Sequence, residues 1–305
     1  MARQVVRAAT RGSALARWQA EHVASLLAAS SPGEVEVELV VVSTEGDRRQ
    51  DVPLDRIGGR GVFVKEVQAA VLDGRADIAV HSAKDLPAAR ELLPEELVIA
   101  CVPEREDPRD ALVGSSLDDL PPGALVGTGS VRRRAQLAHL RPDLTFADLR
   151  GNIDTRLQRS SQYDAVVMAA AALKRLGRDN RVAELLDPLL LLPQVGQGAL
   201  AVECRGDDER TRLLLASVED PEARRAVDAE RAFLSALGGG CDLPVGAHAT
   251  VAADAGEVEL TGMVASRDGH VLVRATRTGA DAGAVGRDLA SFLLDGCGGG
   301  ALLGD

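Results

Sequence analysis

The chain has 305 residues, 46% of them hydrophobic and 27% charged, which is the balance of a folded globular protein, and no apolar run reaches the about 20 residues that a membrane helix needs. The formal net charge of -11 argues against a nucleic-acid binder, because such a protein gathers phosphate with an overall positive field. Residues 1–10 lack the apolar run of a signal peptide, so we expect a cytoplasmic protein with neither a membrane nor a nucleic acid as its partner.

The N-terminal part of the chain alternates between strand and helix patterns. Gln4 to Thr10 reads as a strand, and Ser13 is the expected N-cap of the helix that follows. Residues 43–60 are polar and contain glycines, which is typical of a long loop that moves or binds. The other expected elements are a helix at 15–27, a strand at 34–42, a helix at 62–72 and a buried strand at 76–81.

The next part of the chain repeats this order of elements. Thr128, Gly129 and Ser130 form a tight entry to a helix, as residues 10–13 do before the first one. The expected elements are a strand at 124–127, a helix at 131–140, a strand at 145–149, a short helix at 153–159 and a strand at 164–167. The alternation predicts two α/β lobes of similar plan with mainly parallel sheets.

The expected ligand site lies where the strands of these sheets end. Ligands of such sheets bind beyond the carboxyl ends of the strands, where the free N–H groups of helix N-termini attract anions. The two glycine–serine entries and the turn at Lys84 and Asp85 fall at such ends, so we expect a cleft between the lobes. Segments 98–104 and 192–198 would connect the lobes, and residues 199–204 would form a strand that returns to the first lobe.

The pattern changes from Pro221 onward. A helix at 223–237 leads to three glycines and Cys241, in a loop that we expect to face the cleft. An antiparallel meander and a closing helix should follow, with strands at 245–252, 258–265 and 270–276 and the helix at 281–294. The predicted fold class is α/β, two lobes plus a small α+β C-terminal domain, with domains at 1–99 plus 199–219, at 105–193 and at 221–305.

Arginines gather in the second lobe although the protein is acidic. Residues 132–159 hold seven arginines and three acidic residues, a local excess of four positive charges. Such a cluster suits a compact polyanionic ligand better than a long duplex. A solvated helix face with surface ion pairs is the alternative, and the sequence leaves both interpretations open.

The four cysteines lie far apart and form no C-x-x-C pair, so neither a metal site nor a disulfide framework is indicated. Cys101 and Cys204 each end an apolar run, which is typical of core thiols. Cys241 follows three glycines, a context that permits close approach of a ligand, and spacing alone leaves a functional and an ordinary role equally open. A nucleophilic cysteine–histidine pair is a rival interpretation, but no histidine stands in a recognisable partner motif.

Seven motifs along the chain carry a family resemblance. They are GGRGVFVKE at 58–66, ADIAVHSAKDLP at 76–87, EREDPRD at 104–110, GTGSVRR at 127–133, LRGNIDTR at 149–156, LPQVGQG at 192–198 and GGCDLP at 239–244. In their order and spacing they resemble the hydroxymethylbilane synthase (porphobilinogen deaminase) family. One such motif is weak, whereas seven in the same order are specific.

The resemblance implies two lobes like those of type II periplasmic binding proteins plus a small third domain. It implies a transferase of tetrapyrrole (porphyrin, haem) biosynthesis, which deaminates four porphobilinogen molecules, joins them head to tail on a covalent dipyrromethane primer and releases hydroxymethylbilane and ammonia. The primer would be held by a thioether to the loop cysteine, here Cys241, because a thiolate is nucleophilic enough to capture a methylene-pyrrole cation. A monomer is expected, since no long apolar stripe demands a partner.

The resemblance also assigns roles to individual residues. Asp85 matches the family's catalytic aspartate, and a carboxylate near a pyrrole N–H would stabilise the cationic ring; a turn cap before Pro87 is its alternative role. Each pyrrole ring carries an acetate and a propionate, for which guanidinium forks are matching donors. The implied cofactor-binding residues are Lys84, Ser130, Arg132, Arg133 and Arg150, and the implied substrate-binding residues are Arg11, Ser13 and Arg156.

Two positions depart from the family pattern. Arg60 stands where the family commonly has lysine, which keeps the charge but puts the contacts of its loop in doubt. Gly129 replaces a common serine beside Ser130 and removes one hydroxyl donor.

A non-catalytic anion receptor is the main alternative function, because solute-binding proteins share the two-lobe plan. The cysteine loop and the expected lack of a signal peptide count against it. A cysteine hydrolase is a third interpretation, which predicts a thiol that reacts with acylating agents. Intact mass separates the three, because only the transferase should carry a covalent adduct of two pyrrole units.

Overall fold

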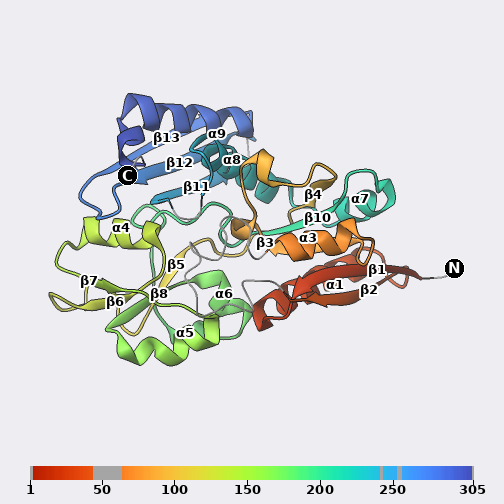
Figure 1. Cartoon of the computed structure of the whole chain (residues 1–305), viewed down its shortest axis with the longest axis horizontal. Coiled ribbons are helices and arrows are strands. Elements are labelled where there is room, and N and C mark those ends of the chain that lie inside the picture. Colours follow the sequence, from red (N-terminus) through yellow and green to blue (C-terminus); the bar gives the residue numbers. More distant parts are fainter. Residues whose placement is uncertain (1–2, 44–63, 241–242, 253–255, 304–305) are drawn as a thin grey trace. The chain divides into compact units, whose positions relative to one another are not determined.

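The computed structural model describes residues 3–43, 64–240, 243–252 and 256–303. They belong to two compact units (Figure 1), Met1–Glu106 with Ala199–Arg224 and Asp107–Gly198 with Arg225–Asp305. Apart from Ser43, the expected loop at 43–60 lies outside the described residues. None of the helices in the described ranges is long and apolar enough to cross a membrane.

The first unit is built on a five-stranded sheet with the order β2-β1-β3-β10-β4. β1 pairs in parallel with β2 and β3, whereas β10 runs antiparallel between β3 and β4. The strands are β1 (Gln4–Arg11), β2 (Val35–Val42), β3 (Ile78–Ser82), β4 (Leu97–Cys101) and β10 (Leu200–Arg205). β10 is the expected returning strand. The expected connection at 98–104 is wrong in part, because its first residues pair with β10 as the edge strand β4.

Helices cover both faces of this sheet because successive residues of β1 point to opposite sides. Val6 and Ala8 pack with Leu27 of α1 on one face, and Ala9 packs with Val67 of α3 on the other. The helices are α1 (Ala14–Ser30), α3 (Lys65–Leu72) and α7 (Glu209–Ala216), with short 3-10 turns at Ala83–Asp85 and Arg90–Leu92.

The second unit contains a sheet of the same plan, with the order β7-β6-β8-β5-β9. β6 is parallel to β7 and β8, and β5 is antiparallel to β8 and β9. Its strands are β5 (Asp110–Val113), β6 (Leu125–Gly127), β7 (Thr145–Ala147), β8 (Ala165–Ala169) and β9 (Val182–Leu185). Its helices are α4 (Val131–Leu140), α5 (Ile153–Arg159) and α6 (Ala170–Arg175), with 3-10 turns at Ser160–Gln162 and Asp179–Arg181.

The expectation of two α/β lobes of one plan is confirmed, but the expectation of mainly parallel sheets is wrong. Each sheet has two parallel and two antiparallel pairings of neighbouring strands. In each sheet the reversed strand pairs with strands that are distant in the sequence, β10 with β3 and β4, and β5 with β8 and β9, so no local alternation of strand and helix predicts its direction. β5 and β9 also have only four residues each, too few to show a period.

The C-terminal part forms the expected antiparallel meander with a helix before and after it. The elements are α8 (Pro221–Ala236), β11 (Val245–Val251), β12 (Val258–Ala265), β13 (Leu272–Gly279) and α9 (Ala282–Ser291), followed by a π-helical turn at Phe292–Gly296 and a 3-10 turn at Gly299–Leu302. Both helices lie on one face of the meander. A Cβ on Gly262 of β12 would lie 2.8 Å from Phe233 of α8 and 2.9 Å from Leu289 of α9, so this glycine lets both helices approach the sheet.

Within the second unit, the meander packs against the second sheet's helix α4. The Nδ1 atom of His139 on α4 lies 3.0 Å from the carbonyl oxygen of Gly269, in the turn between β12 and β13. Ala135, Leu192 and Met263 share one buried apolar cluster at the same place. The segment expected to form a separate domain therefore shares a compact unit with residues of the second lobe.

Candidate active site

Four of the expected site residues belong to the first unit and follow its central strands. Arg11 ends β1, and Ser13 caps α1 by accepting a hydrogen bond of 3.3 Å from the Ala16 amide. Lys84 and Asp85 form the 3-10 turn directly after β3. Because β1 and β3 are parallel neighbours, both ends lie at the same edge of the sheet.

A buried glutamine that we did not predict braces this edge. The amide of Gln19 on α1 donates a hydrogen bond of 2.9 Å to the hydroxyl of Ser82, the last residue of β3. Gln19 is 3% exposed and lies among the apolar residues of the inward face of α1. The sequence signal that could have indicated this contact is a polar residue, Gln19, on an otherwise apolar helix face.

We also did not predict a second polar cluster in the first unit, which is formed by Gln68, His81 and Glu203. The side-chain amide of Gln68 on α3 donates to both oxygens of Glu203, and the Nε2 atom of His81 lies 3.1 Å from the Glu203 carboxylate. All three side chains are buried. They join α3 and β10 to β3, the strand that leads to Asp85.

In the second unit, the start of α4 carries three of the expected residues. Ser130 is the N-cap and accepts a hydrogen bond of 3.4 Å from the Arg133 amide. Arg132 and Arg133 stand in the first turn of α4, and both are buried. The Gly–Ser entry to α4 thus places a serine and two guanidinium groups together.

Both guanidinium groups bind one buried carboxylate, Asp110 at the start of β5. The Nη2 atom of Arg132 lies 2.7 Å from one Asp110 oxygen, and the Nε and Nη2 atoms of Arg133 lie 3.0 Å and 2.6 Å from the other. Gln197 donates a further hydrogen bond of 2.9 Å to the second oxygen. Burial acts to raise the pKa of Asp110, but Arg132 and Arg133 outweigh it and hold that pKa well below its usual range.

Within the described part of the chain, both terminal nitrogens of Arg132 donate hydrogen bonds, whereas its Nε atom does not. Its Nη1 atom donates a hydrogen bond of 2.5 Å to the Leu192 carbonyl, and its Nη2 atom binds Asp110. Its Nε atom is buried and has no hydrogen-bond partner among the described residues. A buried N–H group without an acceptor is costly, so it indicates an oxygen atom supplied by a ligand or by water.

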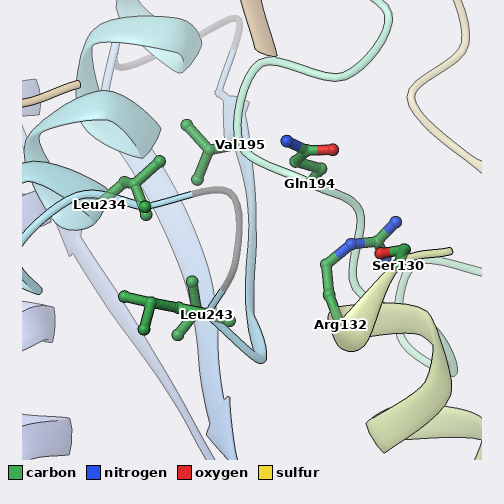
Figure 2. A pocket seen from close by; sticks show the side chains of 8 residues that line it. Ser130, Arg132, Gln194, Val195, Leu234 and Leu243 are labelled. Carbon is green, nitrogen blue, oxygen red and sulfur yellow. The ribbon is translucent and has the colours of Figure 1, made fainter. Parts of the chain in front are cut away.

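A small pocket opens beside this arginine (Figure 2). Ser130 and Arg132 line it from the start of α4, whereas Leu234 of α8 and Leu243 line it from the C-terminal part of the chain. The other lining residues are Gln194, Val195, Gly240 and Val245. The pocket thus joins a cationic donor to an apolar wall, as a ligand with carboxylates on apolar rings requires.

Cys241 itself lies outside the described residues. It directly follows Gly240 in the sequence, and both Gly240 and Leu243 line the pocket.

A buried carboxylate that we did not predict connects the elements around the pocket. Glu230 of α8 accepts hydrogen bonds from the amides of Gly196, at 2.7 Å, and Ala249, at 2.9 Å.

The remaining two expected residues lie around the start of α5. Arg150 precedes this helix, is partly exposed and lies 3.5 Å from Asp148. Arg156, inside the helix, donates a hydrogen bond of 2.8 Å to the Gly151 carbonyl. β6 and β7 are parallel neighbours, so the segments that lead to α4 and α5 leave the same edge of the sheet.

Gly129, one of the two departures from the family pattern, lies where these segments meet. A Cβ at this position would lie 3.2 Å from the carbonyl oxygen of Leu149, which is a tight contact. The glycine therefore lets the entry to α4 approach the residue that precedes Arg150. Arg60, the other departure, lies outside the described residues.

The arginine cluster is not uniform. Arg134 and Arg141 form exposed or partly exposed ion pairs with Asp148 and Asp143, as the alternative of a solvated face expects. Arg132 and Arg133 instead form a buried cluster with one carboxylate. Both interpretations therefore describe part of the segment.

Two of the cysteines are core thiols. Cys101 and Cys204 are fully buried in the apolar cluster beneath α1. Burial raises the pKa of Cys101 to about 12 and that of Cys204 to about 11, so both thiols stay protonated near neutral pH. Neither has the thiolate character of a nucleophile.

Comparison with known proteins gives matches along nearly the whole chain. A family model described as porphobilinogen deaminase, dipyromethane cofactor binding domain, matches residues 6–213, and another described as porphobilinogen deaminase, C-terminal domain, matches residues 224–295. The porphobilinogen deaminase of Syntrophobacter fumaroxidans is 49% identical over 302 residues, which cover 97% of this chain and 96% of that protein. The one of Nitratidesulfovibrio vulgaris (strain DSM 19637 / Miyazaki F) is 50% identical over 302 residues, which cover 95% and 94%.

Similarity to solved structures is lower. The methionine binding protein MetQ is 14% identical with a TM-score of 0.44, and the match covers 72% of this chain and 92% of that one. A nutrient binding protein from Burkholderia cenocepacia bound to methionine is 13% identical with a TM-score of 0.43, covering 72% and 93%. These values are too low to carry an argument about function.

Proposed function

This chain belongs to the porphobilinogen deaminase family, and from that premise we propose that Cys241 carries its dipyrromethane cofactor through a thioether. The protein is a hydroxymethylbilane synthase, a transferase of tetrapyrrole biosynthesis. It deaminates porphobilinogen, joins four units head to tail on the cofactor, and releases hydroxymethylbilane and ammonia.

The observation that carries this function is the Nε donor of Arg132, which is buried and unpaired among the described residues and belongs to a side chain that lines the pocket beside Gly240. A cofactor of two pyrrole rings with acetate and propionate side chains offers carboxylates to this donor and apolar ring faces to Leu234 and Leu243. The residues present therefore fit the group. When bound, the dipyrromethane supplies the free pyrrole carbon from which the product chain grows.

The chain's own cations bind the carboxylates of cofactor and substrate in this proposal. The residues that bind the cofactor are Lys84, Ser130, Arg132, Arg133 and Arg150. Arg11, Ser13 and Arg156 serve the substrate. Guanidinium groups suit this task because they stay charged at all relevant pH values and can bind a carboxylate with two parallel hydrogen bonds.

Asp85 stabilises positive charge in this proposal. When the C–N bond of the protonated aminomethyl group breaks, ammonia leaves with the electron pair and the substrate becomes a cationic azafulvene. A carboxylate near the pyrrole N–H lowers the energy of that cation. No hydrogen bond or ion pair to the Asp85 side chain exists among the described residues, so its carboxylate is not used as a turn cap there.

The attachment is tested by replacing the cysteine. Cys241→Ser should yield folded protein whose intact mass lacks the two-pyrrole adduct and whose activity is almost lost. Cys101→Ala and Cys204→Ala are matched controls, because they remove buried thiols in the core and should keep the adduct. An adduct retained in Cys241→Ser would assign the attachment to another residue.

The same mass measurement addresses the other interpretations. A bare chain mass in wild-type protein would favour an anion receptor, and a thiol acylated by an activated ester would favour a cysteine hydrolase. A cytoplasmic location and a monomeric state remain predictions. The second of these is tested by light scattering during size-exclusion chromatography.

A further inference from the structure

Asp110, like Glu230, is a fully enclosed carboxylate of the second unit. It is 0% exposed, and its two oxygens accept hydrogen bonds from three side chains, those of Arg132, Arg133 and Gln197. It starts β5, the strand that enters the sheet antiparallel. A carboxylate can be buried at such a depth only where its hydrogen bonds and charge are compensated.

Each of the two carboxylate oxygens of Asp110 binds a different arginine. One oxygen accepts from two nitrogens of Arg133 and from Gln197, while the other accepts from Nη2 of Arg132. Together with the Leu192 carbonyl, Asp110 therefore fixes both terminal nitrogens of Arg132. A planar guanidinium held at two corners has no freedom left, so its remaining Nε donor points in a fixed direction.

The cluster is one negative charge short. Two guanidinium cations share a single carboxylate, and no further acidic side chain pairs with either of them in the described part of the chain. Burial and the neighbouring Arg133 both lower the pKa of Arg132, while Asp110 acts in the opposite direction. The surplus positive charge lies at a residue that lines the pocket.

We propose that Asp110 is a positioning residue, which orients Arg132 toward the pocket and leaves the cluster with one unbalanced positive charge for a carboxylate of the bound pyrrole chain. This inference rests on the proposed function of the pocket. Asp110 touches neither cofactor nor substrate; it acts through the two arginines.

Two substitutions separate positioning from simple charge compensation. Asp110→Asn keeps the size but removes the charge, so both guanidinium groups lose their counter-ion and stability should fall as well. Asp110→Glu keeps the charge but moves the carboxylate by one methylene, so it should preserve more of the stability while it displaces Arg132. If Asp110 positions Arg132, Asp110→Glu should lose more free energy of ligand binding than free energy of unfolding.

The experiment measures three quantities on the full chain: the fraction carrying the two-pyrrole adduct by intact mass, the KM for porphobilinogen and the melting temperature. Asp110→Glu should carry less adduct and show a KM raised about 10- to 100-fold, the range for a lost charge-assisted hydrogen bond. Asp143→Asn is the matched control, because it removes an aspartate bound to an arginine at the surface of the same unit, and it should match the wild type in adduct and KM.

If the Asp110 variants do not fold, Gln197→Met decides, because it removes one hydrogen bond to Asp110 without a change of charge. It should raise KM several-fold. Full adduct and unchanged KM in whichever of these variants fold would overturn the proposal. Wild-type protein without any adduct would instead overturn the proposed function, so the two failures are distinguishable.

Discussion

Asp85 shows what the structure adds to a motif. Its turn is fixed by the backbone, since the amide of Ala83 donates to the carbonyl of Ala199, just before β10, at 3.0 Å, and the amide of Leu86 donates to the carbonyl of Ala83 at 3.3 Å. The carboxylate is half-buried and is spared from these contacts. A side chain that the turn does not need for its own stability is available for a ligand.

Replacing Asp85 by asparagine tests this role at the residue scale. Asp85→Asn should fold and turn over about 10²- to 10³-fold more slowly, because the amide keeps the shape but loses the charge that stabilises the cation. Asp85→Glu should recover part of the rate. Single-turnover assays with labelled porphobilinogen separate binding from ring coupling.

Asp73→Asn is the control for that measurement, since Asp73 caps the end of α3 in the same unit and pairs only weakly with Arg75. Its rate should match the wild type. A coupling rate of Asp85→Asn within a few-fold of wild type would move the search to Asp47, which lies outside the described residues.

At the scale of the element, adjacent residues in the first turn of α4 have two roles, one in stability and one at the pocket. Arg132 and Arg133 hold the helix to β5 through Asp110, and Arg132 also lines the pocket. Arg150, by contrast, is partly exposed, and within the described part of the chain its guanidinium group has only a long contact of 3.5 Å to Asp148. The two kinds of arginine should therefore respond differently to truncation.

Arg132→Ala should lose both stability and function, whereas Arg150→Ala should lose function alone. Breaking a buried ion pair costs about 3–5 kcal/mol, because it leaves an unpaired buried charge, while an exposed pair contributes about 1 kcal/mol or less. Urea denaturation measures the first effect, and the porphobilinogen KM measures the second. Equal stability of the two variants would contradict the buried network.

At the scale of the whole molecule, the C-terminal meander and the second sheet share one compact unit. The turn between β12 and β13 is seated on α4, where Gly269 adopts a φ of 79° and a Cβ would lie 2.3 Å from the Ala135 carbonyl oxygen. Glu230 joins α8 to the segment at Gly196 in the same unit. The arginines of α4 and the elements α8 and β11, which flank residue 241 in the sequence, are thus parts of one unit.

Gly269→Ala tests this seating, with Gly177→Ala as its control. Gly177 has a similar φ of 63° but nothing within 4 Å of the position of a Cβ. The control should cost about 1–2 kcal/mol for the left-handed backbone, and Gly269→Ala about 1–3 kcal/mol more for the clash. Thermal unfolding measures the difference in stability between the two variants. Equal losses of stability would show that the turn moves away from α4 without an energetic penalty.

The sequence by itself determined the elements whose signals are local. α4 and α5 begin and end at the predicted residues because Ser130 and Asn152 cap their first turns and apolar residues recur at helical spacing behind them. The C-terminal meander followed from the alternation of its strands, and the family followed from the order of seven motifs. The motifs also pointed to Cys241 and Asp85, because those residues stand in short contiguous patterns.

Only the tertiary structure decided which of the arginines are buried and what holds them. Asp110 lies 22 residues before Arg132 in the sequence and 87 before Gln197. Their contact exists because β5 enters the sheet in the reverse direction, a pairing that no local pattern encodes. Local propensity sets where a helix starts, but the partner of a buried charge depends on which distant segments exclude water from it.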